Sequence, residues 1–208
     1  MSSAQRTPVV PLEAGAGPEN PPCPACGEPL FGWLSTQPGL GGPVSRCESC
    51  GLGVVDVPGE PEEALRELDR RGGDRPRIAN RASFAASLGN AGWAGLEPGA
   101  RYLFTLESAR RLVARRDQIV KSRRWAPAAG LAATWQTLLN SVTFGHNVAL
   151  GALGRGRAAK AAQRWQRRID ALISVVLAIP ALVVAIPVEL AGGLLGRGAV
   201  ITLRFELL

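Results

Sequence analysis

Two short segments, Pro22-Cys-Pro-Ala-Cys-Gly27 and Cys47-Glu-Ser-Cys-Gly51, contain all four cysteines of the chain. Each C-x-x-C pair places two thiols on one tight turn, and the glycine that follows lets the backbone bend sharply. Twenty residues lie between the two pairs, a spacing typical of zinc sites. The sequence therefore predicts one four-cysteine metal site.

The predicted ligands are Cys23, Cys26, Cys47 and Cys50, and the expected metal is Zn²⁺. Four thiolates complete a tetrahedral shell with no position for water or substrate, so the zinc is expected to be structural. A redox dithiol pair and an iron–sulfur centre are the alternatives. The first 22 residues lack a secretory signal pattern, which favours a reducing compartment and metal binding over disulfides.

The segments before, between and after the two cysteine pairs differ in composition. Residues 1–22 are rich in Pro, Gly and Ala and are expected to form a disordered leader. Between the cysteine pairs, Leu30-Phe-Gly-Trp-Leu34 predicts a short hairpin. Residues 54–79 are interpreted as a linker with one short helix, which begins near Pro61 and ends at Gly72-Gly73.

Charge is unevenly distributed along the chain. Residues 1–75 contain six basic and eleven acidic side chains, a net charge of −5, whereas residues 76–208 contain eighteen basic and six acidic ones, a net charge of +12. The back half is therefore expected to meet an anionic membrane surface or nucleic acid. Arg46 is the only cation between Cys23 and Cys50, so nucleic-acid binding by the ribbon itself is disfavoured.

Residues 80–122 contain local patterns that predict a helix and a strand. Thr105 is a natural N-cap for a helix whose apolar face is formed by Leu106, Ala109, Leu112 and Val113. The run Gln118-Ile-Val-Lys-Ser122 is compatible with a strand.

The same region resembles the C-terminal third of a zinc-ribbon-bearing subgroup of class I S-adenosylmethionine-dependent methyltransferases. The motifs that carry the resemblance are Asn80 with Ser83, Trp93 with Leu96, Arg101-Tyr-Leu103, Phe104-Thr-Leu-Glu-Ser108, and Gly196–Arg204 as the last strand. Tyr102 stands where the family often has histidine. The resemblance implies a methyltransferase origin for about two-thirds of the chain.

The sequence departs from that family in the part that binds the methyl donor. Between Gly53 and Asn80 there is no apolar strand followed by a glycine-rich turn and an acidic residue. No catalytic or cofactor-binding residue is therefore assigned, and the sequence favours a protein that is no longer an enzyme.

The back half is apolar and, at its centre, uncharged. Residues 125–154 contain no Lys, Arg, Asp or Glu, and an apolar stripe at helical spacing predicts a core-facing or interfacial helix. The stripe consists of Leu131, Trp135, Leu138, Leu139 and Val142. Gln136, Asn140 and Ser141 lie off the stripe, and His146 is interpreted as a surface or packing residue.

Residues 155–168 are basic and include Trp165, and they precede an uncharged run from Ala171 to Val188. This run approaches the length that crosses a bilayer, and Pro180 and Pro187 predict a bent helix. Membrane insertion or deep interfacial binding is favoured over burial in a soluble core, because a basic, tryptophan-bearing flank suits anionic headgroups. The cations on the N-terminal side predict that the ribbon faces the cytoplasm.

Together these patterns predict an α+β fold: a small zinc ribbon, a mostly helical, incomplete methyltransferase-like region, a hydrophobic C-terminal helix and a final strand. The expected segments are a leader (1–22), the ribbon (23–53), a linker with a short helix (54–79), a methyltransferase-like remnant with basic amphipathic helices (80–168), a hydrophobic membrane-associated segment (169–196) and a terminal strand (197–208).

The function favoured by the sequence is that of a membrane-associated, non-catalytic interaction protein. Its expected partners are an anionic membrane surface or bilayer, with a partner protein as a further candidate. Two alternatives stay open: a methyltransferase subunit acting with a separate cofactor-binding chain, and a basic zinc-ribbon protein that binds nucleic acid. Nucleic acid is disfavoured because the basic region has only scattered aromatic residues.

Overall fold

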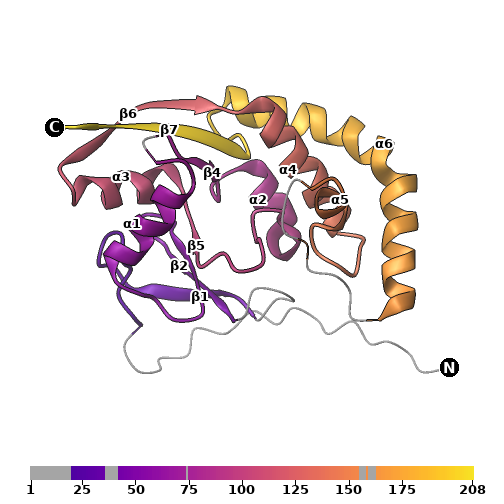
Figure 1. Ribbon diagram of the computed structural model, residues 1–208, viewed down its shortest axis with the longest axis horizontal. Helices are drawn as coiled ribbons and strands as arrows, with labels where there is room; N and C mark the ends of the chain where they lie inside the picture. The colour runs from indigo at the N-terminus through magenta and orange to yellow at the C-terminus, as the bar shows by residue number, and fades with distance from the viewer. Residues whose placement is uncertain (1–19, 36–41, 74, 155–157, 159–162) are drawn as a thin grey trace.

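The computed structural model describes residues 20–35, 42–73, 75–154, 158 and 163–208. Nearly all of the expected leader, and part of the basic segment 155–168, lie outside the described residues. The fold is α+β, as the sequence predicts, with two small antiparallel sheets, a long apolar helix near the C-terminus and a final strand. Figure 1 shows a half built from the two sheets with α1 and α3, and a helical half containing α2, α4, α5 and α6.

The first sheet has four strands in the order β1-β2-β3-β5, and all neighbouring strands are antiparallel. Strands β1 (Leu30–Leu34) and β2 (Val44–Cys47) form the predicted hairpin, and β3 (Gly53–Val55) continues it. The fourth strand, β5 (Tyr102–Leu103), comes from much later in the chain. The cysteine-bearing segment and the rest of the protein therefore share one sheet.

Residues 54–79 contain more structure than the sequence interpretation of a linker includes. Helix α1 (Pro61–Arg70) begins at the expected proline, but its apolar face of Ala64, Leu65 and Leu68 is buried in the protein core. Strand β4 (Arg77–Ala79) then enters the second sheet. The helix is part of the core because its three apolar residues, at helical spacing, form one face that packs against α3.

The second sheet has the order β4-β7-β6 and is again antiparallel. The predicted strand after Asp117 is confirmed as β6 (Gln118–Trp125), and the predicted terminal strand as β7 (Val200–Leu207). The last strand of the chain thus lies at the centre of its sheet, where Ile201 and Leu203 are buried.

The four-stranded sheet is buried on both faces. Successive residues of a strand point to opposite sides, so Val54 and Tyr102 join one apolar cluster whereas Val55 and Leu103 join another. The first cluster also contains three of the cysteines, the buried residues of α1 and α3 (Leu106–Ala114), and Ile201 and Leu203 of β7. The cysteine turns are therefore part of the main core.

The helical half is connected to the second sheet through both α4 and α6. Helix α4 (Pro127–Asn140) starts where β6 ends, and α6 (Arg164–Leu194) leads back to β7. The two helices pack against each other, with α2 (Phe84–Gly89), the short helix η1 (Asn90–Gly92) and α5 (Val148–Ala152) beside them. Figure 1 shows α6 running along the outer edge of the molecule and bending, as its two internal prolines predict.

Helix α4, predicted to be a core-facing or interfacial helix, buries polar side chains as well as part of its apolar stripe. Its buried residues include Thr134, Gln136, Thr137 and Asn140, whereas most of the stripe is only partly buried and Val142 is 44% exposed. The polar residues are buried because they bond to one another and to backbone. Gln136 Nε2 donates to Asn140 Oδ1 at 2.8 Å, and the Leu150 amide donates to Gln136 Oε1 at 2.8 Å.

Candidate metal centre and exposed helix face

The two C-x-x-C turns have the same backbone geometry. In the first, the Cys23 amide donates to the Glu28 carbonyl at 2.7 Å, and the Gly27 amide donates to the Cys23 carbonyl at 2.8 Å. In the second, the equivalent bonds from Cys47 and Gly51 measure 2.8 and 2.9 Å. Gly27 and Gly51 both have positive φ values, +82° and +74°, which side-chain-bearing residues rarely adopt.

These turns bring all four predicted ligands together. The four Sγ atoms lie within 4.8 Å of one another, with 3.6 Å between those of Cys23 and Cys50 and 3.4 Å between those of Cys26 and Cys47. In a regular tetrahedral site with metal–sulfur bonds of about 2.3 Å, the sulfurs are about 3.8 Å apart. The cluster therefore has the size of a four-cysteine metal site.

The cysteine thiols of this cluster differ in how readily they lose a proton. The hydrogen bond from Cys50 lowers the pKa of Cys23 to about 5, and sharing that proton raises the pKa of Cys50. Burial raises the pKa of Cys26. A cation bound between the four sulfurs would favour the deprotonated form of all of them, because the thiolate is the form that binds metal.

The second turn is anchored to the start of α3. Thr105 Oγ1 donates to the Cys50 carbonyl at 2.6 Å and accepts from the Ser108 amide at 3.0 Å, so one hydroxyl caps α3 and holds the turn. Ser108 Oγ accepts from the Thr105 amide at 2.9 Å and completes a capping box. A Cβ on Gly51 would lie 2.9 Å from Thr105 Cγ2, which explains why glycine is needed there.

Cationic side chains surround this centre. Arg111 donates to Ser49 beside the second turn, and its hydrogen bond with Glu107 raises its pKa, with the thiolates of Cys26 and Cys50 acting in the same direction. Burial and the charge of Arg46 lower the pKa of Arg81 to about 10. These cations offset the net negative charge that four thiolates around a divalent metal would carry.

The second candidate feature is the outward face of α6. Its exposed apolar side chains recur at intervals of three and four residues, and we call this set the outer stripe: Leu172, Val175, Val176, Ile179, Val183, Ile186, Leu190 and Leu194. Val175 is 76% exposed and Ile179 is 73% exposed, although both are large and apolar. Among the described residues, α6 is the one helix long and apolar enough to cross a membrane, and 11% of its most apolar 18-residue window is buried.

The acidic residues of α6 point the other way. Asp170 is fully buried and accepts from the amides of Phe144 and Gly145 at 2.7 and 2.9 Å. Glu189 is 3% exposed and accepts from Trp125 Nε1 at 2.7 Å and Thr134 Oγ1 at 2.8 Å. A buried charge is costly without such bonds. The helix therefore turns its acidic side chains inward and many of its apolar side chains outward.

Glu189 holds three elements together. Its carboxylate also accepts from the Ala199 amide at 3.1 Å, next to β7, while Trp125 ends β6 and Thr134 belongs to α4. A Cβ on Gly130 of α4 would overlap this carboxylate, so glycine leaves the space that Glu189 occupies. In the sequence, Glu189 is the one acidic residue in the apolar run between Ala171 and Leu195. A lone acid in such a run is itself a signal that a buried partner exists.

The structure also places His146 and the residues that carry the methyltransferase resemblance. His146 packs half-buried against the helical half, as expected, and lies outside the cysteine cluster. Several of the residues that carry the methyltransferase resemblance are buried caps or core residues: Ser83 caps α2, Asn80 donates to the Gly198 carbonyl at 3.1 Å, and Trp93 is fully buried. Each therefore has a structural role within this chain.

Comparison with known proteins finds no match to this chain. No protein-family model, no curated protein and no solved structure matches the chain. The candidate metal centre and the outer stripe of α6 are therefore the features that bear on function.

Proposed function

We propose that this chain is a membrane-associated, non-catalytic interaction protein. The outer stripe of α6 enters the apolar part of one leaflet, and the four-cysteine centre holds a structural zinc ion on the cytoplasmic side. The observation that carries the proposal is the arrangement of α6, whose outer stripe is exposed while Asp170 and Glu189 are buried and hydrogen-bonded.

This arrangement is unfavourable in water and favourable at a membrane. Soluble monomers rarely expose a continuous apolar patch of this kind. Transfer of the outer stripe into hydrocarbon gains about 25 cal/mol for each Å² of apolar surface removed from water. The soluble-core alternative requires other protein to cover α6, and the described residues leave its outer stripe open.

The contacts of α6 favour insertion into one leaflet over a complete crossing. Its inner face bonds to the body of the protein near both ends, through Asp170 and Glu189, and in the middle, where Trp135 Nε1 donates to the Ala178 carbonyl at 2.8 Å. A helix packed on protein along its length, with one free apolar face, suits a position in the plane of the membrane.

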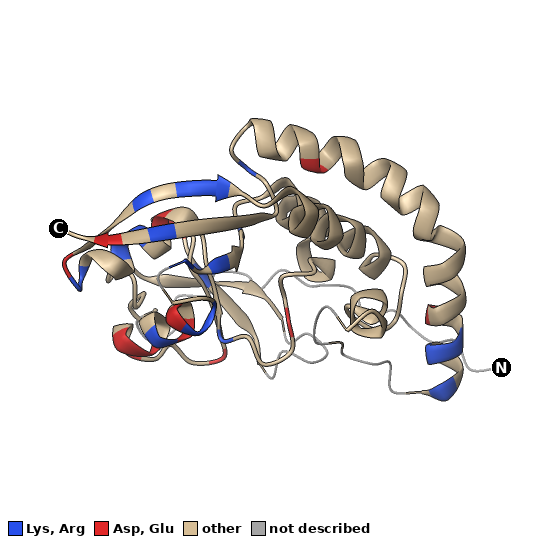
Figure 2. Ribbon diagram, turned by 45° about the horizontal axis from the view of Figure 1, so that its top comes forward, with Lys and Arg blue, Asp and Glu red and all other residues tan. Residues whose placement is uncertain are grey.

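Charges flank the outer stripe at both ends. Arg164, Arg167 and Arg168 are exposed in the first turns of α6, and Arg123 and Arg124 are exposed on β6. Figure 2 shows basic positions in the first turns of α6 and on β6, and none along the rest of α6. Each cation near an anionic surface contributes about 1 kcal/mol, and anionic lipids are concentrated in the cytoplasmic leaflet. Free thiols also suit the reducing cytoplasm.

Zinc is the metal that the cysteine centre fits best. Four soft thiolates at tetrahedral spacing select zinc or an iron–sulfur centre. The buried position of three of the ligands within the main core supports a structural role. The non-catalytic part of the proposal rests on the caps and core contacts made by the residues that resemble a methyltransferase, whose origin we retain as part of the proposal.

The proposal is tested by fractionation of cells that express the chain, with salt and carbonate washes followed by detergent. We expect retention through the washes and release by detergent. Val176→Asp puts a charge on the outer stripe and is expected to move at least half of the protein to the soluble fraction. Val57→Asp is the matched control, because Val57 lies far from α6 in sequence and both valines are 61% exposed.

Two results would contradict the proposal. Recovery of the unaltered protein in the soluble fraction would mean that another protein surface or a second copy covers the outer stripe. Equal behaviour of the two aspartate variants would mean that retention does not depend on α6. Flotation with vesicles containing phosphatidylglycerol, compared with phosphatidylcholine alone, tests the part played by the flanking arginines.

A further inference from the structure

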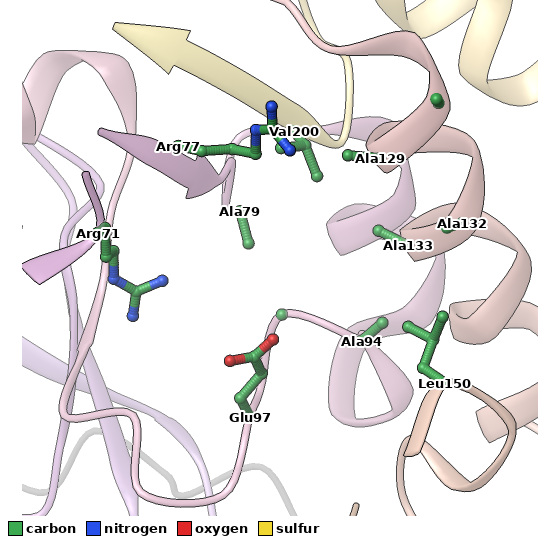
Figure 3. A pocket seen from close by; sticks show the side chains of 12 residues that line it. Arg71, Arg77, Ala79, Ala94, Glu97, Ala129, Ala132, Ala133, Leu150 and Val200 are labelled. Carbon is green, nitrogen blue, oxygen red and sulfur yellow. The ribbon is translucent and has the colours of Figure 1, made fainter. Parts of the chain in front are cut away.

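A cavity of about 580 Å³ lies where the sheet half meets the helical half. Its walls come from the end of α1, from β4, from the segment that follows η1, and from α4 and α5. Figure 3 shows charged side chains at one end of the cavity and small apolar ones at the other. The volume falls in the range of sites that hold small molecules.

The apolar end is formed mainly by α4. Ala128, Ala129, Ala132 and Ala133 occupy one face over two turns of that helix, opposite Ala94. Methyl side chains leave space that leucine or isoleucine would fill, so the alanine face of α4 keeps the cavity open. An extended hydrocarbon chain is the kind of group that such a wall accommodates.

The charged end contains Arg71, Arg77 and Glu97. Arg71 is held in place, because its Nη2 donates to Glu67 at 3.0 Å and its guanidinium lies 5.5 Å from the centre of the Phe104 ring. Its Nε is buried without a hydrogen-bond partner. Within the described part of the chain, Arg77 and Glu97 form no ion pair.

We propose that this cavity binds a single-chain amphiphile with an anionic head, the class that includes long-chain fatty acids. The carboxylate would bind Arg77, whose guanidinium group matches its shape and lies beside Val200 in Figure 3, and the hydrocarbon chain would lie along the alanine face. None of the residues that line the cavity is aromatic, so no side chain there is available to stack on a nucleoside base. This binding is independent of the membrane association proposed above.

The test uses the full chain with zinc bound and three matched probes, titrated below their aggregation limits by calorimetry. Oleate has both the head and the chain, oleyl alcohol has the chain without the charge, and acetate has the charge without the chain. Oleate is expected to bind with a stoichiometry of one, oleyl alcohol at least tenfold more weakly, and acetate without measurable heat.

Two variants locate the binding. Ala132→Leu fills the apolar end, and Arg77→Gln removes one exposed cation with little risk to folding. Each is expected to weaken oleate binding at least tenfold, which corresponds to about 1.4 kcal/mol. The matched controls are Ala114→Leu and Arg115→Gln at the exposed end of α3, which should bind oleate as the unaltered chain does.

The outer stripe is the competing location for an apolar ligand. Loss of oleate binding in Val176→Asp, with binding retained in Ala132→Leu and Arg77→Gln, would place the ligand on α6 and overturn the proposal. Equal binding of oleate and oleyl alcohol, or no binding of oleate, would overturn it as well. Vesicle flotation of Ala132→Leu should be unchanged, so failure of the cavity proposal and failure of the membrane proposal give different results.

Discussion

The half built from the two sheets and the half built from α4, α5 and α6 differ in how many polar side chains they bury. Around the cysteine centre, the buried residues are mostly apolar, with Thr105 and Ser108 as polar exceptions, and the ion pairs, such as that between Arg116 and Asp69, lie on the surface. In the helical half, the buried residues include Gln136, Asn140, Asp170 and Glu189, while the outer stripe is exposed. We take this difference as support for the proposal that the first half is surrounded by water and that the outer stripe of the second half meets a membrane.

The comparison also separates two ways of stabilising a fold. The sheet half is linked by the metal centre and by the apolar core around it, so its stability should depend on zinc. The helical half is linked by hydrogen bonds between buried polar groups, so its stability should depend on individual acceptors. Each prediction below changes one of these features and leaves its counterpart in the other half intact.

Loss of the metal is expected to have the largest effect, and to act on the sheet half. Apparent free energies of about 10–16 kcal/mol are typical of zinc bound to small zinc-dependent folds, and three of the cysteines belong to the main core here. Cys47→Ser should lower zinc content below one per chain and abolish the cooperative unfolding transition, measured by elemental analysis and circular dichroism. Ser49→Ala, on the exposed part of the same turn, should keep both. Unchanged unfolding in Cys47→Ser would show that the core is stable without the metal.

Removal of the Glu189 carboxylate should be the most damaging change in the helical half. Glu189→Ala leaves the donors of Trp125, Thr134 and Ala199 without their acceptor, at an expected cost of about 3–5 kcal/mol in the free energy of unfolding. Denaturant titration in detergent measures this cost. Glu206→Ala, which breaks the exposed pair with Lys121, is the control and should cost less than about 1 kcal/mol. A similar small cost in both variants would refute a special role for the buried acid.

The stability of the helical half should also fall as the pH falls. Desolvation lowers the pKa of His146 to about 4 from an ordinary value of 6.5. Below pH 6.5 the unfolded chain binds a proton that the folded chain excludes, so stability is lost between pH 6.5 and 4, by up to roughly 3 kcal/mol.

The comparison of His146→Gln with the unaltered chain isolates this contribution, because protons that compete for the cysteines affect both proteins equally. The free energy of unfolding of the variant should depend less steeply on pH over this window. Identical pH dependence of the two proteins would mean that His146 is protonated in the folded state without penalty.

The smallest effect is expected at the link between the metal centre and α3. Thr105→Ala removes the cap of α3 and the donor to the Cys50 carbonyl, which should cost about 1–2 kcal/mol while zinc stays bound. Thr105→Ser keeps the hydroxyl and should cost less. Thermal unfolding with a zinc assay measures both. Release of zinc from the alanine variant would show that the cap holds the metal turn itself, which would sharpen the dependence of the sheet half on its metal.

Features set by neighbours in sequence could be predicted from the sequence alone. The two C-x-x-C turns, the start of α1 at Pro61 and the Thr105 cap depend on residues within a few positions, and the structure has all of them. The strand after Asp117 and the last strand were also predictable from composition and spacing. The binding of a metal and its identity, the methyltransferase origin, and the membrane association with its orientation stay predictions.

Tertiary structure decided the features that join distant residues. Glu189 lies 64 residues from Trp125 and 55 from Thr134, and no local pattern indicates that these side chains meet. The burial of the polar side chains of α4 depends on distant contacts of the same kind: an apolar stripe shows which side chains are alike, but not whether water, protein or lipid faces them. The sequence by itself determined the metal ligands and the position of the apolar segment, because both follow from spacing along the chain. Only the tertiary structure decided which face of each helix is buried, because a buried polar group is stable only where folding supplies its partners.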